Sequence, residues 1–575
     1  MTNPSTRWAE IIVGEVAAAG VSRIVLAPGS RSTPLTVAAD RHDSIETDTH
    51  LDERSAGFYA VGYGKRSGEP AALISTSGTA AVNFHPAVVE ANQSRTPLLL
   101  LTADRPPELQ DSGANQTIDQ DGLYGEATRF QRTLQPPVGA DRSLRSLRTT
   151  VARAVAAARG PHPGPVHLNV PFRKPLAPIE TDSAERVQPP VSRGSSGRDE
   201  AYVSIHRGTV TPSQAVVEEL EVAIGTADRG LVVVGPRNPD RADEFAIASF
   251  ARRTGFPLVA DPLSQVRFGK HVDDVTVVGG YDAYVDRVDW FDPDLIIRLG
   301  ASPTSKPLRT ALAESDARQF LVDPAGGWRE ATFTATDLVE SAARPLLNTL
   351  AAADAEKNSN WVDRFERAER AHWSALEASP TDWEGAIAAH VLAGAPDRST
   401  VFVSNSMPVR DLDRYGRPRA SEFTVLGNRG ASGIDGITST ALGAGSVTDD
   451  PLVLLIGDLA YFHDMNGLLA LGRFGVEATI VLVNNDGGGI FHGLAISSFD
   501  PPFERQFLTP HGLDFSATAD LYQLEFDRAD PDELADAVRE STGRAGTQLL
   551  EVRTDGARSH EIREELANRV LEELT

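Results

Sequence analysis

The sequence predicts an α/β protein with three domains, each built on a mainly parallel sheet flanked by helices. Short runs of aliphatic and β-branched residues alternate with segments of helical spacing along most of the 575 residues. In the stretch 451–491, the apolar runs Leu452–Ile456 and Ala478–Val483 enclose one such segment, Tyr461–Phe474. Two strands joined through one helix form a βαβ unit, so these strands are predicted to be parallel and adjacent.

Polar residues follow both strands of this unit. Gly457-Asp458 ends the first strand, and Asn484-Asn485 with the glycines 487–489 ends the second. Because the carboxyl ends of adjacent parallel strands lie side by side, Asp458 and Asn485 are expected to be neighbours. A carboxylate, an amide oxygen and the backbone carbonyl of Gly487 form a donor set that suits Mg²⁺, and the glycines let the backbone approach phosphate groups closely. For Asp458 alone, a capped βα turn is the simpler interpretation.

The N-terminal segment repeats this order of strand, turn, helix and strand, which predicts a similar α/β domain at each end of the chain. A loop rich in serine, 28–34, follows the first predicted strand, and Ser77-Gly78 follows the predicted strand Ala71–Ser75. The predicted elements are the helix Arg7–Ala19, the strand Ser22–Ala27, a helix that begins near Glu53, the strand Ala71–Ser75, the helix Ala80–Gln93 and the strand Pro97–Thr102.

A polar segment rich in Pro, Gly and Ser, residues 179–200, is typical of a linker between domains. It divides a first domain, 1–178, from a central α/β domain, 201–350, and a last domain covers 351–575. The central domain contains no GxGxxG turn, so nothing in it favours dinucleotide binding. Its predicted strands are Gly230–Val234, Pro257–Ala260, Leu295–Leu299 and Phe320–Val322.

Composition restricts the function classes. The 80 acidic and 55 basic residues give a net charge of −25, which repels nucleic acid and anionic membranes. The acidic residues are scattered, and this favours a surface adapted to high salt over an acidic interaction patch. No apolar run has the length of a membrane span. The absence of cysteine excludes thiol catalysis and thiolate zinc sites, and the N-terminus shows no secretory signal pattern, so we expect a cytoplasmic protein.

Several stretches together resemble one family. They are PGSRSTP at 28–34, DER at 52–54, TSGTA at 76–80, TADRPPEL at 102–109, GANQ at 113–116, NRGASGIDG at 428–436, GDL at 457–459 and NN at 484–485. The last two are similar to the diphosphate–Mg²⁺ signature of thiamine diphosphate enzymes, GDG…NN. The set as a whole resembles the 2-succinyl-5-enolpyruvyl-6-hydroxy-3-cyclohexene-1-carboxylate (SEPHCHC) synthases of menaquinone biosynthesis, in which Leu459 at the third position is usual.

The resemblance implies a thiamine diphosphate-binding fold with Mg²⁺, or Mn²⁺ in its place. It implies a transferase that decarboxylates 2-oxoglutarate and adds the succinyl-semialdehyde carbanion to isochorismate. Glu53 is then the catalytic carboxyl against the aminopyrimidine ring of the cofactor, where a raised pKa would suit it, although a DER tripeptide alone is more typical of a helix N-terminus.

The remaining site residues are also implied by the resemblance. Because both substrates are dianions, the substrate site is expected to be rich in cations. The substrate-binding candidates are Ser30, Arg31, Arg105, Asn115, Gln116, Lys306, Ser406, Arg410 and Arg429. The cofactor-binding candidates are Glu53, Ser77, Gly78, Ile434, Gly457, Asp458, Leu459, Asn485, Gly488, Ile490 and Phe491, and the metal-binding candidates are Asp458, Asn485 and Gly487. Taken singly, the arginines are more typical of surface ion pairs, and Ile434 and Phe491 of ordinary core packing.

Two details complete the comparison. The family commonly has Lys-Arg where this chain has Lys306-Pro307, so Arg309 would have to substitute for the missing arginine. Ser406 and Arg410, four residues apart, would share a helix face, with Pro408 in the first turn. The resemblance also implies a homodimer or homotetramer in which the acid and the metal site that serve one cofactor come from different subunits.

Three alternatives remain at this stage. The first is another thiamine enzyme, such as a 2-oxoacid decarboxylase or acetolactate synthase, which would need no arginine cluster. The second is a nucleotide-dependent oxidoreductase, suggested only by the repeated βαβ units. The third is a metabolite-binding module with a degenerate site, against which the intact Glu53, Asp458 and Asn485 argue.

Overall fold

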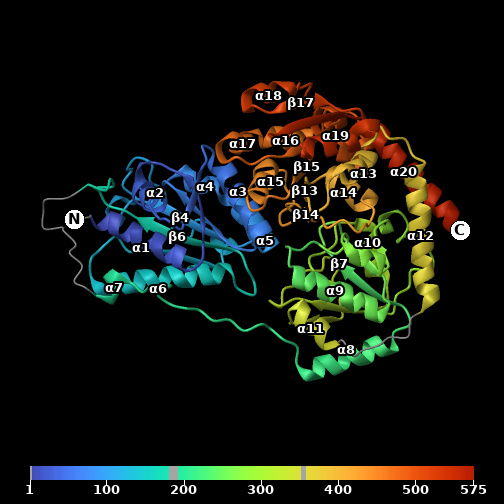
Figure 1. Ribbon diagram of the computed structural model, residues 1–575, viewed down its shortest axis with the longest axis horizontal. Coiled ribbons are helices and arrows are strands. Elements are labelled where there is room, and N and C mark those ends of the chain that lie inside the picture. Colours follow the sequence, from blue (N-terminus) through green and yellow to red (C-terminus); the bar gives the residue numbers. More distant parts are fainter. Residues whose placement is uncertain (1–2, 180–191, 351–357) are drawn as a thin grey trace. The chain divides into compact units, whose positions relative to one another are not determined.

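The computed structural model describes residues 3–179, 192–350 and 358–575, and contains three six-stranded sheets (Figure 1). Every strand pair in the three sheets is parallel. Helices connect the strands, as parallel pairing requires. The predicted α/β class with three parallel sheets is therefore confirmed.

The first sheet has the strand order β2-β1-β3-β4-β6-β5. The predicted strands in this region are present, although β5 and β6 were not predicted. The sheet consists of β1 (Arg23–Ala27), β2 (Glu46–Thr49), β3 (Ala71–Ser75), β4 (Leu98–Asp104), β5 (Phe130–Thr133) and β6 (Pro165–Pro171). Its helices are α1 (Pro4–Ala18), α2 (Thr33–Asp40), α3 (Glu53–Ser67), α4 (Thr79–Asn83), α5 (His85–Ser94) and α6 (Asp141–Ala158).

The predicted helix 80–93 is divided into α4 and α5. The division falls at Phe84, two residues before Pro86. Proline has no backbone N–H, so Pro86 cannot donate the hydrogen bond that a continuous helix needs. Figure 1 shows α1 and α6 side by side, and their apolar residues pack against β1, β3, β4 and β6 in one buried core.

The last sheet has the order β14-β13-β15-β16-β18-β17, which is the order of the first sheet when the strands are counted from β13. The predicted similarity of the two end domains is thus confirmed at the level of topology. The strands are β13 (Thr400–Val403), β14 (Thr424–Leu426), β15 (Leu452–Gly457), β16 (Thr479–Asn484), β17 (Glu525–Arg528) and β18 (Gln548–Arg553). The main helices are α12 (Ser359–Glu377), α13 (Glu384–Gly394), α14 (Met407–Tyr415), α15 (Ile437–Gly445), α19 (Leu534–Thr542) and α20 (Gly556–Leu574).

The middle sheet has a different order, β12-β11-β10-β7-β8-β9, which corresponds to the doubly wound order 3-2-1-4-5-6 read from β9. The four predicted strands are present, and the two short strands at the edges were not predicted. The strands are β7 (Gly230–Val234), β8 (Leu258–Ala260), β9 (Val277–Val278), β10 (Leu295–Leu299), β11 (Arg318–Val322) and β12 (Asp337–Val339), with helices α8 (Gln214–Thr226), α9 (Arg241–Thr254), α10 (Lys306–Glu314) and α11 (Ala343–Thr349).

Contacts divide the chain into two compact units. Unit 1 is Met1–Gly208 with Asn428–Thr448 and Asp464–Val476, and unit 2 is Thr209–Gly427 with Asp449–His463 and Glu477–Thr575. The predicted boundaries 1–178, 201–350 and 351–575 stay a prediction. Most of the predicted linker, residues 180–191, lies outside the described residues, and within its remainder Arg193–Ser196 forms the short helix α7.

Within unit 1, α15 packs directly on α3. A Cβ at Gly62 would lie 2.0 Å from the carbonyl oxygen of Thr440, and a Cβ at Gly443 would lie 2.0 Å from that of Tyr59. The two helices therefore meet backbone against backbone, at positions where glycine alone leaves room.

The predicted helix 461–474 is instead three short elements: α16 (Asp458–His463), a 3₁₀ turn (Met465–Leu468) and α17 (Leu469–Phe474). The helix is interrupted at Asp464, whose buried carboxylate accepts a hydrogen bond from the backbone nitrogen of Ser439 at 2.7 Å. A tertiary contact thus overrides the helical spacing.

Among the described residues, no helix combines the length and apolar character that crossing a membrane requires.

Candidate functional site

The first group of site residues lies where the strand connections of the first sheet diverge. In open parallel sheets, ligands bind beyond the carboxyl ends of the strands at such a point, which here lies between β1 and β3. The loop 28–32 follows β1 and carries Ser30 and Arg31, and the turn 76–78 follows β3 and carries Ser77 and Gly78. The two loops touch, since a Cβ at Gly29 would lie 2.7 Å from Thr76 Cβ.

Arg105, at the end of the neighbouring strand β4, connects this group to the loop 113–116. Its guanidinium donates to Ser77 Oγ and, at 2.8 Å, to the carbonyl oxygen of Asn115. Gln116 has a positive φ of 57° and exchanges two hydrogen bonds with Ser77, one from its own Nε2 at 2.9 Å and one to its carbonyl oxygen at 3.0 Å. The structure therefore brings together five of the predicted residues: Ser77, Gly78, Arg105, Asn115 and Gln116.

Arg31 is a second cation in this region, and the charge of Arg105 affects the pKa of Arg31. Its side chain is buried, and Nη1 donates to the carbonyl oxygen of Phe172 at 2.7 Å. Burial lowers the pKa of Arg31, and the positive charge of Arg105 lowers it further, while Asp104 opposes the shift. A bound anion would stabilise the charged form of Arg31 and so oppose this shift.

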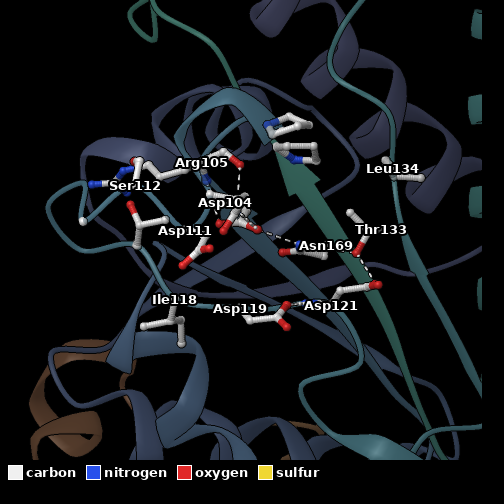
Figure 2. A pocket seen from close by; sticks show the side chains of 15 residues that line it. Asp104, Arg105, Asp111, Ser112, Ile118, Asp119, Asp121, Thr133, Leu134 and Asn169 are labelled. Atoms are coloured by element: carbon white, nitrogen blue, oxygen red, sulfur yellow. Dashed lines mark hydrogen bonds between the residues drawn. The ribbon is translucent and has the colours of Figure 1, made fainter.

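A cavity of about 650 Å³ opens beside Arg105 (Figure 2). It runs along the carboxyl ends of β4, β6 and β5, where Asp104 accepts a hydrogen bond from Asn169 at 2.8 Å. Its wall carries Asp104, Asp111, Asp119 and Asp121, and among the described residues that line it Arg105 is the only basic one. Because these carboxylates repel dianions, an anionic ligand is favoured only at the end of the cavity that Arg105 occupies.

Glu53 is the first residue of α3 and follows the carboxyl end of β2. Asp52 caps the helix by accepting hydrogen bonds from the backbone nitrogens of Arg54 and Ser55. The neighbouring Asn466 donates to Asp52 at 3.0 Å, and the Arg54 guanidinium lies 3.6 Å from Asp464. In the parts of the chain that the structure describes, the Glu53 carboxylate itself makes no hydrogen bond or ion pair, so it is available to a ligand.

Arg429 and Ile434 belong to the loop 428–436, which is part of unit 1 together with Glu53. The loop is fixed by Glu90, whose carboxylate accepts from the backbone nitrogens of Gly430 and Ala431 at 3.0 and 2.7 Å. Glu90 also forms a buried ion pair with Lys65 of α3 at 3.1 Å. The structure thus joins residues that are 340 positions apart in the sequence.

The second group of site residues lies in unit 2, at the carboxyl ends of β15 and β16. These strands are parallel and adjacent, with Gly457 opposite Val483, so the expected neighbourhood of Asp458 and Asn485 is confirmed. Asp458 is buried, and its Oδ2 accepts from the Gly487 backbone nitrogen at 3.0 Å. Burial raises the pKa of Asp458, although hydrogen bonds from Leu459 and Gly487 oppose the shift.

The turn after Asn485 keeps the backbone open. Gly487 has a φ of 147°, and a Cβ there would lie 2.1 Å from the carbonyl oxygen of Leu508, so only glycine fits. Gly488 follows, and Ile490 and Phe491 lie in a 3₁₀ turn, where the Phe491 ring packs edge-on against Phe507.

These residues fit a divalent cation. Asn485 Oδ1 is buried and has no hydrogen-bond partner in the described chain, so it offers an unused acceptor. Asp458 adds a carboxylate, and Gly487 a backbone carbonyl without a side chain beside it. No group of three or more His, Cys, Asp or Glu residues suited to a metal occurs in the described residues. Phosphate oxygens and water would complete the coordination of a cation here.

His511 was not predicted from the sequence. Its Nδ1 accepts from the Leu513 backbone nitrogen at 3.0 Å, so its Nε2 carries the hydrogen and donates to Asp458 Oδ2 at 3.2 Å. The histidine therefore orients the carboxylate. It lies 53 positions from Asp458 and belongs to none of the recognised motifs, so no sequence pattern pointed to it.

The three remaining candidates lie on two other helices of unit 2. Lys306 is the exposed first residue of α10. Ser406 precedes α14 with a φ of 69°, and Arg410 donates to its carbonyl oxygen at 2.6 Å, with Pro408 in the first turn as expected. Arg309 donates to the carbonyl oxygens of Pro303 and Thr304, at the start of the helix that carries Lys306. Whether it substitutes for the arginine that Pro307 replaces stays a hypothesis.

Comparison with known proteins agrees with this arrangement. Residues 6–123 match the thiamine pyrophosphate enzyme N-terminal TPP binding domain, and residues 414–552 match the corresponding C-terminal TPP binding domain. A solved structure, the thiamine diphosphate-dependent 4-hydroxybenzoylformate decarboxylase of Rhodococcus jostii RHA1, has a TM-score of 0.71 over 95% of this chain and 99% of that one. At 17% identity, this likeness concerns the fold alone.

Relatives with much higher identity share one name. The 2-succinyl-5-enolpyruvyl-6-hydroxy-3-cyclohexene-1-carboxylate synthase of Haloarcula marismortui is 55% identical over 100% of this chain and 99% of that protein. That of Halobacterium salinarum is 55% identical over 99% and 98%. The chain therefore belongs to the family of the thiamine diphosphate-dependent 2-succinyl-5-enolpyruvyl-6-hydroxy-3-cyclohexene-1-carboxylate synthases.

Proposed function

We propose that this chain is a SEPHCHC synthase, a transferase that decarboxylates 2-oxoglutarate and joins the remaining four-carbon unit to isochorismate. The observation that carries the proposal is a pair of guanidiniums: Arg31 follows β1, Arg105 follows β4, and the positive charge of Arg105 lowers the pKa of Arg31. A simple 2-oxoacid decarboxylase has no need of this pair, whereas two dianionic substrates do.

Each residue has a defined role in this proposal. Asp458, Asn485 and the Gly487 carbonyl hold Mg²⁺, or Mn²⁺, against the diphosphate of the cofactor. When bound, thiamine diphosphate supplies the carbanion chemistry that neither substrate can provide alone. Glu53 would share a proton with the aminopyrimidine ring nitrogen, since its carboxylate makes no hydrogen bond or ion pair with the described residues.

The remaining candidates bind substrate or shape the site. Arg31, Arg105 and Arg429 bind the substrate carboxylates, and Asn115, Gln116 and Ser30 orient the acceptor. Lys306, Ser406 and Arg410 add cationic and polar contacts. Ile434, Ile490 and Phe491 exclude water from the cofactor rings, which strengthens the electrostatic interactions inside.

The test is a substrate-consumption assay in high salt with Mg²⁺ and thiamine diphosphate. Loss of isochorismate that requires 2-oxoglutarate, and that is abolished in Glu53→Gln, supports the synthase and the role of Glu53. Release of CO₂ from 2-oxoglutarate with isochorismate untouched would mean that the acceptor is wrong, and Pro307 would be the first position to examine. Consumption of neither substrate by protein that binds the cofactor would refute the proposal.

The proposal includes a homo-oligomer in which Glu53 and Asp458 of the partner subunit serve the same cofactor. Mixing two inactive variants tests it. Co-expressed Glu53→Gln and Asp458→Ala chains would form mixed dimers in which one of the two sites has both residues intact, so part of the activity would return. Activity that stays at the level of the separate variants, in samples whose mixed composition is verified by mass spectrometry, would contradict a shared site.

A further inference from the structure

The two adjacent asparagines at the end of β16 are held in different ways. Asn484 is bonded at both ends of its amide, since Nδ2 donates to Glu551 at 2.7 Å and Oδ1 accepts from the Asp486 backbone nitrogen at 3.1 Å. Asn485 is bonded at one end only. Its Nδ2 donates to Glu384 at 2.6 Å, and its buried Oδ1 has no partner in the described residues.

Glu384 decides which end of the Asn485 amide is free. A carboxylate accepts hydrogen bonds and cannot donate them when ionised, so it bonds to the amide nitrogen and never to the amide oxygen. With the nitrogen fixed on Glu384, the oxygen must point to the opposite side. A metal cation requires that orientation, because the amide nitrogen has no lone pair to offer.

Glu384 belongs to a buried ionic cluster with Arg563 and Asp411, and these two residues fix its position. Arg563, on α20, donates to Glu384 Oε2 at 2.5 Å and binds both oxygens of Asp411, on α14, at 2.8 and 2.7 Å. All three side chains are almost fully buried. Ser559 Oγ additionally accepts from the Glu384 backbone nitrogen at 3.3 Å. The guanidinium fork is fixed on Asp411, so the Arg563 Nη2 that binds Glu384 Oε2 is fixed too, and Glu384 Oε1 is left to accept from Asn485.

We infer that Glu384, held by Arg563 and Asp411, is a positioning residue that presents Asn485 Oδ1 to the divalent cation. The inference rests on the proposed function only in taking Asn485 as a metal ligand. Residues behind a metal ligand commonly contribute 10- to 100-fold to metal affinity, because they fix the orientation of the ligating atom. Since Asp411 is adjacent to Arg410, the same cluster fixes the helix that carries one of the candidate substrate residues.

The test measures Mn²⁺ affinity by electron paramagnetic resonance of free Mn²⁺, with thiamine diphosphate present at saturating concentration. In Glu384→Gln, the new amide can offer either its oxygen or its nitrogen to Asn485, so the orientation of Asn485 is no longer enforced. We expect the affinity to fall by about 10- to 100-fold. The matched control is Glu551→Gln, which changes the same kind of contact at Asn484. It is expected to change the affinity by less than about threefold, because Asn484 Oδ1 stays bonded to the backbone.

A double variant separates positioning from loss of folding. In E384Q/N485D, the amide of the new glutamine donates to one oxygen of the new aspartate and leaves the other oxygen for the metal. Mn²⁺ affinity should therefore recover by at least tenfold relative to E384Q, whereas N485D alone sets two carboxylates against each other and should bind weakly. A purely structural role for Glu384 predicts no recovery.

The outcomes distinguish the inference from the proposed function. If Asn485→Ala abolishes Mn²⁺ binding while Glu384→Gln, shown by circular dichroism to be folded, binds as tightly as the wild type, the inference fails and the metal site stands. If E384Q weakens binding without any recovery in the double variant, the inference also fails. If the wild type binds no Mn²⁺ in the presence of thiamine diphosphate, the metal site and the inference fall together.

Discussion

Replacing Gly62 by alanine tests whether α3 and α15 depend on backbone contact. Alanine favours a helix over glycine by about 1 kcal/mol, so at an open helical position the substitution stabilises. At position 62, however, the added Cβ would lie 2.0 Å from the Thr440 carbonyl oxygen and 2.8 Å from the Ala444 nitrogen, and ordinary contact begins near 3.4 Å. The obstacle is backbone, which cannot rotate away, so α15 would have to move by more than an ångström.

The expected cost follows from these distances. Overpacking in a close-packed interior costs about 1–3 kcal/mol, and an obstacle made of backbone belongs at the upper end of that range. After subtraction of the gain in helix propensity, we expect Gly62→Ala to destabilise unit 1 by about 2 kcal/mol. Because the loop 428–436 leads into α15, the substitution should also displace Arg429 and Ile434 and lower activity.

Gly14→Ala is the matched control. Gly14 lies in the interior of α1, and a Cβ there would meet no atom within 4 Å. This variant should therefore be as stable as the wild type or up to about 1 kcal/mol more stable. Urea unfolding in high salt provides the midpoints, and hydrogen exchange of the α15 peptides shows whether the change is local. A Gly62→Ala midpoint equal to that of Gly14→Ala would refute the backbone contact between the helices.

Three further predictions concern charge. Burial raises the pKa of Asp464 from 3.8 to about 6, so the stability that its protonated form contributes is complete below about pH 4 and is lost as the pH rises through 6. A shift of about two units corresponds to about 3 kcal/mol in the free energy of unfolding. The Asp464→Asn variant should lack this dependence on pH between pH 4 and 6 in urea unfolding. Lys65→Met leaves Glu90 buried without its cation and should cost about 3–5 kcal/mol in urea unfolding, part of which Lys65→Met/Glu90→Gln should recover. With a net charge of −25, the thermal midpoint should rise as KCl increases towards molar concentrations, and a midpoint independent of salt would contradict the halophilic interpretation.

The sequence predicted the strands with long apolar runs and missed those without them. The run Ala71–Ser75 coincides with β3, a strand buried on both faces that is apolar from Ala71 to Ile74. β6 is also buried along its whole length, but His167 and Asn169 interrupt its apolar residues, so no unbroken run marks it. By contrast, β5 and β17 lie at sheet edges and are largely exposed, so their sequences show no such run. Short edge strands such as β9 are defined by pairing with a neighbour, which no local pattern reveals.

The candidate site was predictable where a motif carries it and unpredictable where a tertiary contact does. Asp458 and Asn485 follow strands that spacing identifies, so their proximity could be inferred. Glu384 is the first residue of α13 and Arg563 lies within α20, so both are far along the chain from Asn485. Each alone is an ordinary charged residue of a helix. Only the folded chain shows that Glu384 bonds to the Asn485 amide and Arg563 to Glu384.

The two end sheets show how one topology supports different chemistry. Both have the same strand order. Glu53 and Arg429 follow the second strand of the first and of the last sheet, and further candidate residues follow the first, third and fourth strands in chain order. In the first sheet these strands lead to Arg31, Ser77 and Arg105, which donate hydrogen bonds and attract anions. In the last sheet they lead to Ser406, Asp458 and Asn485, of which the latter two offer oxygens to a cation. The topology fixes where ligands bind, and the side chains at the strand ends decide which ligand each sheet accepts.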